Sequence, residues 1–136
     1  MITAVDTSVL LDLFLPDPRF AEVSAAALRH ADAAGSMIVC EIVYAELAAQ
    51  FSRRQDLDNA LSQLDIRIES IDSEIAFAAG RAFRKYRDTG GPRARILPDF
   101  LIAAHAEIRT GVLLSRDRGF YRVHFRKLRL IDPTMR

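Results

Sequence analysis

Four acidic side chains stand where they could carry chemistry: Asp6, Glu46, Asp99 and Asp117. Asp6 follows the apolar run 2–5, and Asp117 comes shortly after the apolar run 112–114. Asp99 opens an apolar stretch and Glu46 lies inside one. A carboxylate beside a core segment is costly unless its charge is compensated. These acids therefore indicate a site that uses negative charge, with a metal ion or a basic partner as the compensating group.

The ends of parallel strands meet at one edge of a sheet, which could bring Asp6 and Asp117 together. The adjoining helices could bring Glu46 and Asp99 to the same cleft. Four clustered carboxylates would repel one another, and a divalent cation removes that penalty. Oxygen ligands without a set of His or Cys favour Mg²⁺ or Mn²⁺ over Zn²⁺. The sequence permits this geometry, and we expect Mg²⁺ (or Mn²⁺) as the cofactor.

The elements that must position these acids follow from the apolar periodicity. Short apolar runs predict strands at 2–5, 37–40, 112–114 and 128–131. Residues 66–71 alternate in polarity and are expected to form a strand or an extended connector. Helical spacing predicts helices at 9–14, 19–33, 42–51, 57–64, 73–87 and from Pro98 onward. Residues 115–119 are expected to form a loop. Strands that alternate with helices predict an α/β fold with a short, mostly parallel sheet.

Two glutamates lie in or just before the helix expected at 42–51. Glu46 shares a face with Ile42 and Val43, so we expect it to point partly inward, which is unusual for a glutamate. Glu41 stands at the strand-to-helix junction. It is interpreted as a residue that interacts with the helix dipole, and a role as a further acid of the site is the alternative.

Composition predicts one soluble, folded domain spanning residues 1–136. Hydrophobic residues make up 50% and charged residues 27% of the chain, which is ordinary globular usage. No apolar run approaches the roughly 18 residues that span a bilayer, and the first residues do not form a signal peptide, so we expect a cytoplasmic protein. The single cysteine, Cys40, excludes an internal disulfide and is expected to be a buried thiol.

Charge is distributed unevenly along the chain. Residues 1–80 hold 5 basic and 13 acidic side chains, whereas residues 81–136 hold 14 basic and 5 acidic ones. Arginines around a buried acidic site would suit a phosphate backbone, and a solvated surface is the alternative. The arginines expected to hold RNA are Arg84, Arg87, Arg93, Arg95, Arg116 and Arg118.

The chain resembles the PIN-domain nucleases, and more closely the VapC-type toxins of bacterial type II toxin–antitoxin pairs. The matching segments are VDTSVLLDLF at 5–14, VYAEL at 43–47, PDFLIAAHA at 98–106 and LLSRDRGF at 113–120. The resemblance implies a PIN-like three-layer α/β/α fold and carries the metal-binding acids onto the same four residues reached above. It also implies supporting hydroxyls at Thr7 and Ser115. Many relatives have a further acid where this chain has Gly119.

The activity implied by the resemblance is Mg²⁺-dependent endonucleolytic cleavage of RNA. Water activated by the metal would attack a phosphodiester in line and leave a 5′-phosphate and a 3′-hydroxyl. A cognate antitoxin protein and a homodimer are implied as partners, and no membrane.

Three other functions compete with this one. A non-catalytic PIN-like module would bind RNA or a protein through the basic face. A metal-free nuclease would use two of His30, His105 and His124. His30 has no evident catalytic partner, His105 lies in the apolar helix and is expected to be packed, and His124 lies in a basic segment. A phosphoacceptor domain would need a lysine near the acids, and the chain has only Lys85 and Lys127.

Overall fold

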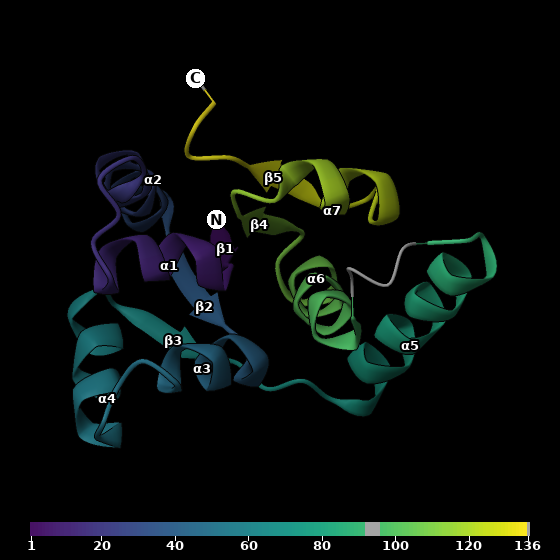
Figure 1. Ribbon diagram of the computed structural model, residues 1–136, viewed down its shortest axis with the longest axis horizontal. Helices are drawn as coiled ribbons and strands as arrows, with labels where there is room; N and C mark the ends of the chain where they lie inside the picture. Colours follow the sequence, from purple (N-terminus) through teal and green to yellow (C-terminus); the bar gives the residue numbers. More distant parts are fainter. Residues whose placement is uncertain (92–95, 136) are drawn as a thin grey trace.

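The computed structural model describes residues 1–91 and 96–135, and its centre is one parallel sheet (Figure 1). The strands are β1 (Ile2–Val5), β2 (Ser36–Val39), β3 (Ile66–Ile68), β4 (Val112–Leu114) and β5 (Arg129–Ile131). They lie in the order β3-β2-β1-β4-β5, and all four pairings are parallel. The prediction of a mostly parallel sheet is confirmed.

Helices cover both faces of this sheet. They are α1 (Thr7–Phe14), α2 (Ala21–Ala34), α3 (Glu41–Ala48), α4 (Arg54–Gln63), α5 (Ser73–Asp88), α6 (Leu97–Arg109) and α7 (Arg118–His124). Figure 1 shows α1, α2 and α4 on one side of the strands and α5, α6 and α7 on the other, which makes the expected three layers. In the described part of the chain, no helix has both the length and the apolar character to cross a membrane.

Local sequence signals set several element ends. Asp72 caps α5 by accepting a hydrogen bond from the Ile75 backbone N–H at 2.9 Å. Gly35 follows α2, where a Cβ would lie 1.8 Å from the Met1 carbonyl oxygen. Gly91 follows α5, where a Cβ would lie 2.6 Å from the Tyr86 ring. Both glycines are therefore required by close packing.

The core lies on both faces of the central strands. β4 is buried along its whole length, and α6 is buried at Phe100 and throughout 102–106. This agrees with the predicted apolar unit that Asp99 and Asp117 frame. The predicted end of the loop at residue 119 is wrong, because α7 begins at Arg118.

The strand order reverses at β1. Successive strands β1, β2 and β3 run toward one edge of the sheet, and the chain then crosses back to place β4 on the other side of β1. In open parallel sheets, the crevice beyond the carboxyl ends of the strands at such a reversal is where ligands bind. The fold therefore favours a site where β1 and β4 end.

Candidate functional site

Asp6 lies directly after β1 and is the N-cap residue of α1, at the strand reversal. It is 6% exposed. Its Oδ1 accepts a hydrogen bond from the Thr7 backbone N–H at 2.8 Å, and its Oδ2 accepts one from the Ser115 hydroxyl at 2.7 Å. Both oxygens are engaged, so the orientation of this carboxylate is fixed from two elements.

The Thr7 hydroxyl orients a second acid. Its Oγ1 donates to Glu46 Oε1 at 2.6 Å, which ties the start of α1 to α3. Thr7 is 8% exposed, whereas Glu46 is exposed. Glu46 was expected to point partly inward: the residue lies at the rim, and its carboxylate turns inward to the Thr7 hydroxyl.

Ser115 connects Asp6 to the loop after β4. Its buried hydroxyl donates to Asp6 and accepts a hydrogen bond from the Asp117 backbone N–H at 2.9 Å. The Ser115 backbone N–H in turn donates to the Ile131 carbonyl of β5 at 3.0 Å. Both hydroxyls predicted to support the site, Thr7 and Ser115, therefore contact a predicted acid.

Three of the predicted acids, Asp6, Glu46 and Asp117, interact electrostatically. Burial raises the pKa of Asp6 to about 6, although the hydrogen bonds from Ser115 and Thr7 act in the opposite direction. The negative charges of Glu46 and Asp117 raise this pKa further. A cation at this strand edge would relieve the repulsion between these carboxylates.

Asp99 occupies the first turn of α6 and is partly exposed. Its Oδ2 accepts a hydrogen bond from the Ile96 backbone N–H at 3.3 Å, so it caps its own helix. Within residues 1–91 and 96–135, no three Asp, Glu, His or Cys side chains are arranged so that they could hold one metal ion. The four-acid metal site stays a prediction. Its donors are carboxylate oxygens oriented by hydroxyls, and this chemistry fits Mg²⁺ or Mn²⁺.

Two of the predicted RNA-holding arginines lie on α5. Arg84 pairs with Asp88 at 2.9 Å between Nε and Oδ2, and its side chain is 77% exposed. The Arg87 guanidinium carbon lies 6.0 Å from the Phe83 ring centroid. Arg118 is the first residue of α7. Arg93 and Arg95 lie outside the described residues.

Arg116 has a different environment. Its Nε and Nη2 donate to the two carboxylate oxygens of Asp12 at 2.8 and 3.0 Å. Asp12 is 3% exposed and was not singled out from the sequence. The signal that could have revealed it is its position inside the apolar run VLLDLF, because an aspartate is almost never fully buried unless it is paired.

Glu41 makes a structural contact with the backbone of Ile71. Both of its carboxylate oxygens accept from the Ile71 backbone N–H, at 2.9 and 3.2 Å, so it binds the connection between β3 and α5. This contact adds to its position in the first turn of α3, which the dipole interpretation requires.

The three histidines lie in separate surroundings. His105 is 1% exposed and its Nε2 lies 2.8 Å from the Glu69 carbonyl oxygen, and burial lowers its pKa. His124 packs among aromatic rings, 5.1 Å from the Tyr86 ring between centroids. His30 is exposed on α2. These surroundings give no support to a pair of histidines acting together.

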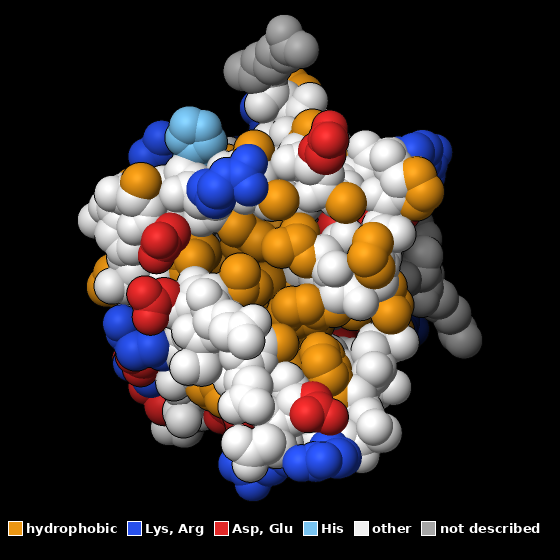
Figure 2. Space-filling view, turned by 90° about the vertical axis from the view of Figure 1, so that its left-hand side faces the viewer, with side chains coloured by type: hydrophobic (Ala, Val, Ile, Leu, Met, Phe, Trp, Pro, Cys, Tyr) orange, Lys and Arg blue, Asp and Glu red, His pale blue; other side chains and the backbone are white. Residues whose placement is uncertain are grey.

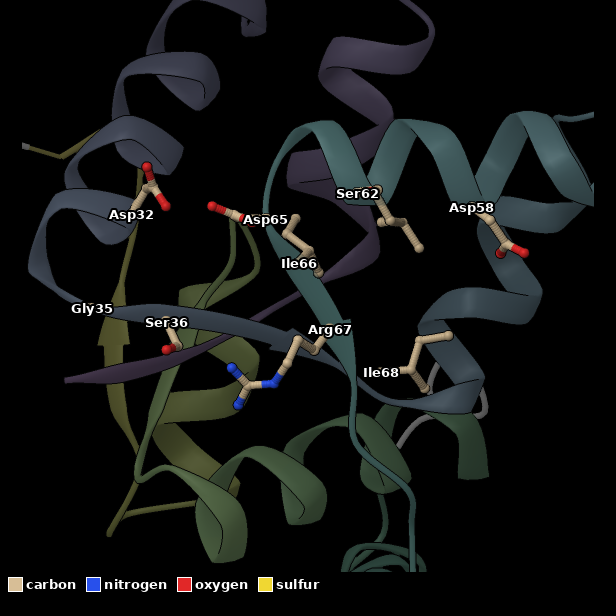
Figure 3. Close-up of a pocket in the computed structure, with 10 residues that line it drawn as sticks. Asp32, Gly35, Ser36, Asp58, Ser62, Asp65, Ile66, Arg67 and Ile68 are labelled. Atoms are coloured by element: carbon tan, nitrogen blue, oxygen red, sulfur yellow. The ribbon is translucent and has the colours of Figure 1, made fainter.

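A hollow lies beside β3, at an edge of the sheet, and the four predicted site acids do not line it. Figure 3 shows it with Asp32 and Asp65 above the strand and Arg67 extending from the strand. None of the predicted catalytic residues lines it. This hollow is therefore not the predicted site.

Comparison with known families gives a match over most of the chain. The family model described as PIN domain matches residues 3–126. A search of curated protein sequences found no match.

Solved structures with the same fold include several toxin–antitoxin complexes. VapBC2 from Rickettsia felis, bound to a DNA fragment from its promoter, is 19% identical with a TM-score of 0.74, covering 97% of this chain and 98% of that one. VapBC-1 from nontypeable Haemophilus influenzae is 22% identical with a TM-score of 0.73, covering 99% and 100%. A toxin–antitoxin complex from Klebsiella pneumoniae is 22% identical with a TM-score of 0.70, covering 98% and 99%.

Proposed function

The chain belongs to the PIN domain family, and on that premise we propose that it is a Mg²⁺-dependent endoribonuclease and the toxin of a toxin–antitoxin pair. The observation that carries the proposal is the joined set of acids and hydroxyls at the strand reversal. Ser115 binds Asp6, Thr7 binds Glu46, and the charges of Glu46 and Asp117 act on Asp6. Such preorganised acids are expected where a cation must be held beside a substrate.

Each residue has a defined task in this proposal. Asp6, Glu46, Asp99 and Asp117 would hold Mg²⁺ (or Mn²⁺). Ser115 and Thr7 fix the orientation of the first two carboxylates, so that their remaining lone pairs are presented to a cation. When bound, the ion supplies Lewis-acid activation of a phosphodiester and of the attacking water. The products are a 5′-phosphate and a 3′-hydroxyl.

Basic side chains supply the substrate contacts. Arg84 and Arg87 lie at the end of α5, and Arg118 begins α7 beside Asp117. Tyr86 of α5 packs on Phe120 of α7, with ring centroids 6.2 Å apart, so these two helices lie against one another. Arginines on these two helices can bind the RNA backbone, which carries no sequence information. Target choice must then come from RNA shape or unstacked bases.

Partner proteins are proposed from two observations. The similar solved structures named above are toxin–antitoxin complexes. Apolar side chains also gather in the middle of the face shown in Figure 2, the side on which α2 and α4 lie in Figure 1. The exposed apolar residues of the chain include Leu15, which is 49% exposed, and Val23, which is 37% exposed. We expect a cognate antitoxin to cover apolar surface of this kind, and the chain itself to form a homodimer, which a mass measurement in solution would test.

The deciding experiment compares RNA cleavage by the wild type, Asp6→Asn and Asp99→Asn, with Mg²⁺ or Mn²⁺ and with EDTA. Asp56→Asn, at an exposed aspartate of α4, is the matched control. We expect cleavage by the wild type and the control, products with 5′-phosphates, and loss of cleavage in both site variants and in EDTA. A wild type that binds total cellular RNA without cutting it would instead favour the non-catalytic module.

A further inference from the structure

A buried charged cluster joins α1 and α2 to the loop after β4. At its centre, Asp12 accepts two hydrogen bonds from Arg116, and its Oδ2 also accepts one from the Ser24 hydroxyl at 2.6 Å. The guanidinium carbon of Arg116 lies 4.0 Å from the Phe20 ring centroid. One edge of the guanidinium is therefore bound by a carboxylate, and one face is covered by an aromatic ring.

These contacts differ from those of an arginine that waits for RNA. The Arg116 side chain is 27% exposed, against 77% for Arg84. Its bidentate partner, Asp12, is buried, and a buried carboxylate that lost its cation would be left uncompensated. Moving Arg116 onto a phosphate would therefore cost the free energy of leaving the buried Asp12 carboxylate without a cation. The geometry favours a permanent internal role.

The position of the pair suggests what that role is. Arg116 stands between Ser115 and Asp117, while Asp12 belongs to the same helix, α1, that begins after Asp6. Ser115 already binds the start of this helix through Asp6. Two consecutive loop residues thus hold α1 at two points, which fixes the direction of the loop as well as its distance.

We propose that Arg116 is a positioning residue, which holds Asp117 beside Asp6 through its buried ion pair with Asp12. The consequence for catalysis rests on the proposed function, whereas the consequence for the Asp117 loop does not. Arg116 then acts through Asp117 and makes no contact with substrate, so its role differs from the one expected for Arg118.

The test uses Arg116→Gln, Asp12→Asn and the double variant in the full chain, with Arg118→Gln, two residues later at the start of α7, as a matched loss of charge. Three quantities are measured: hydrogen exchange of the Asp117 amide, Mn²⁺ affinity by calorimetry without RNA, and kcat and KM on an RNA oligonucleotide. The amide is informative because it donates to the Ser115 hydroxyl. Circular dichroism checks folding.

We expect Arg116→Gln and Asp12→Asn each to weaken Mn²⁺ binding and to lower kcat by about 10- to 100-fold, the range for residues that orient ligands. Asp117 amide exchange should accelerate, and KM should stay within about twofold. The double variant should be no worse than the poorer single variant, because both remove one interaction. Arg118→Gln should instead raise KM and reduce the salt slope by about one, with unchanged Mn²⁺ affinity.

An opposite pattern overturns the proposal. If Arg116→Gln raises KM and Asp12→Asn changes nothing, Arg116 contacts RNA. If Arg116→Gln does not fold, Arg116→Lys replaces it, because lysine keeps the charge but loses the bidentate geometry. An Asp117 amide that exchanges in Arg116→Lys at the same rate as in the wild type refutes the positioning role. If the wild type cleaves no RNA, the proposed function fails, and amide exchange still decides whether Arg116 holds the loop.

Discussion

Asp6→Asn should make the protein more stable at neutral pH while it abolishes cleavage. The folded-state pKa of Asp6 is about 6, above the value of about 3.9 for an unfolded aspartate. Folding therefore favours the protonated form, and the stability contributed by Asp6 is fully present below about pH 4 and lost as the pH rises through 6. At neutral pH the wild type carries an ionised carboxylate in a place that disfavours it.

The magnitude follows from the shift. A difference of about two pKa units corresponds to about 3 kcal/mol at pH 7. Asparagine removes that penalty, and its oxygen can still accept from the Thr7 amide as an N-cap. The Ser115 hydroxyl now faces an amide nitrogen, a mismatch that costs about 1 kcal/mol. The net gain of about 1 to 2 kcal/mol should raise Tm by roughly 4 to 8 °C.

Thermal denaturation followed by circular dichroism in EDTA measures this effect. The advantage of Asp6→Asn over the wild type should be largest at about pH 7.5 and shrink as the pH falls through 6. Below about pH 4.5 it should reverse, because the ionisation penalty of Asp6 is then gone while the mismatch of about 1 kcal/mol with Ser115 remains. The exposed control Asp56→Asn should stay within about 1 °C of the wild type. A variant less stable than the wild type at pH 7.5, or a difference in Tm that does not change with pH, would refute the reasoning.

Three further substitutions separate the roles of neighbouring groups. Thr7→Val keeps the shape of the side chain but removes the 2.6 Å hydrogen bond to Glu46, so Mn²⁺ affinity measured by calorimetry should fall about tenfold. Glu41→Gln should weaken the contact to Ile71 by about 1 kcal/mol in urea denaturation but leave cleavage within twofold; a large loss of cleavage would make Glu41 an acid of the site. Gly119→Asp should fold, because a Cβ there meets no atom within 4 Å, and it should lower the Mn²⁺ concentration needed for half-maximal cleavage. An unchanged metal requirement would count against a ligand position at residue 119.

The sequence predicts the strand ends at Asp6 and Ser115 well because strand ends and caps are local signals. An apolar run that ends at Asp6, followed by a helix, already places this acid at a strand end. The same holds for Ser115 after β4, and a parallel sheet brings the two together. By contrast, α7 has only seven residues and includes Gly119, so it lacks the length from which helical periodicity can be recognised.

Contacts between segments far apart in the chain could not be predicted from the sequence. Glu46 shares its helix with Ile42 and Val43, and i, i+4 spacing alone does not show that the residue stays at the rim. The pair of Asp12 and Arg116 joins residues 104 positions apart. With 19 basic and 18 acidic side chains, composition offers far too many possible partners to select this one.

Two buried aspartates on one helix show how a structural acid differs from an acid available to a ligand. Asp12, inside α1, receives a guanidinium on both oxygens, so its charge is neutralised within the fold. Among the described residues, the donors to Asp6 are the Thr7 amide and the Ser115 hydroxyl, which orient a carboxylate without cancelling its charge. The negative charges of Glu46 and Asp117 add to the uncompensated negative charge around Asp6. A cation from solution would therefore gain more at Asp6 than at Asp12, and this difference in compensation supports Asp6 as the central acid of the proposed site.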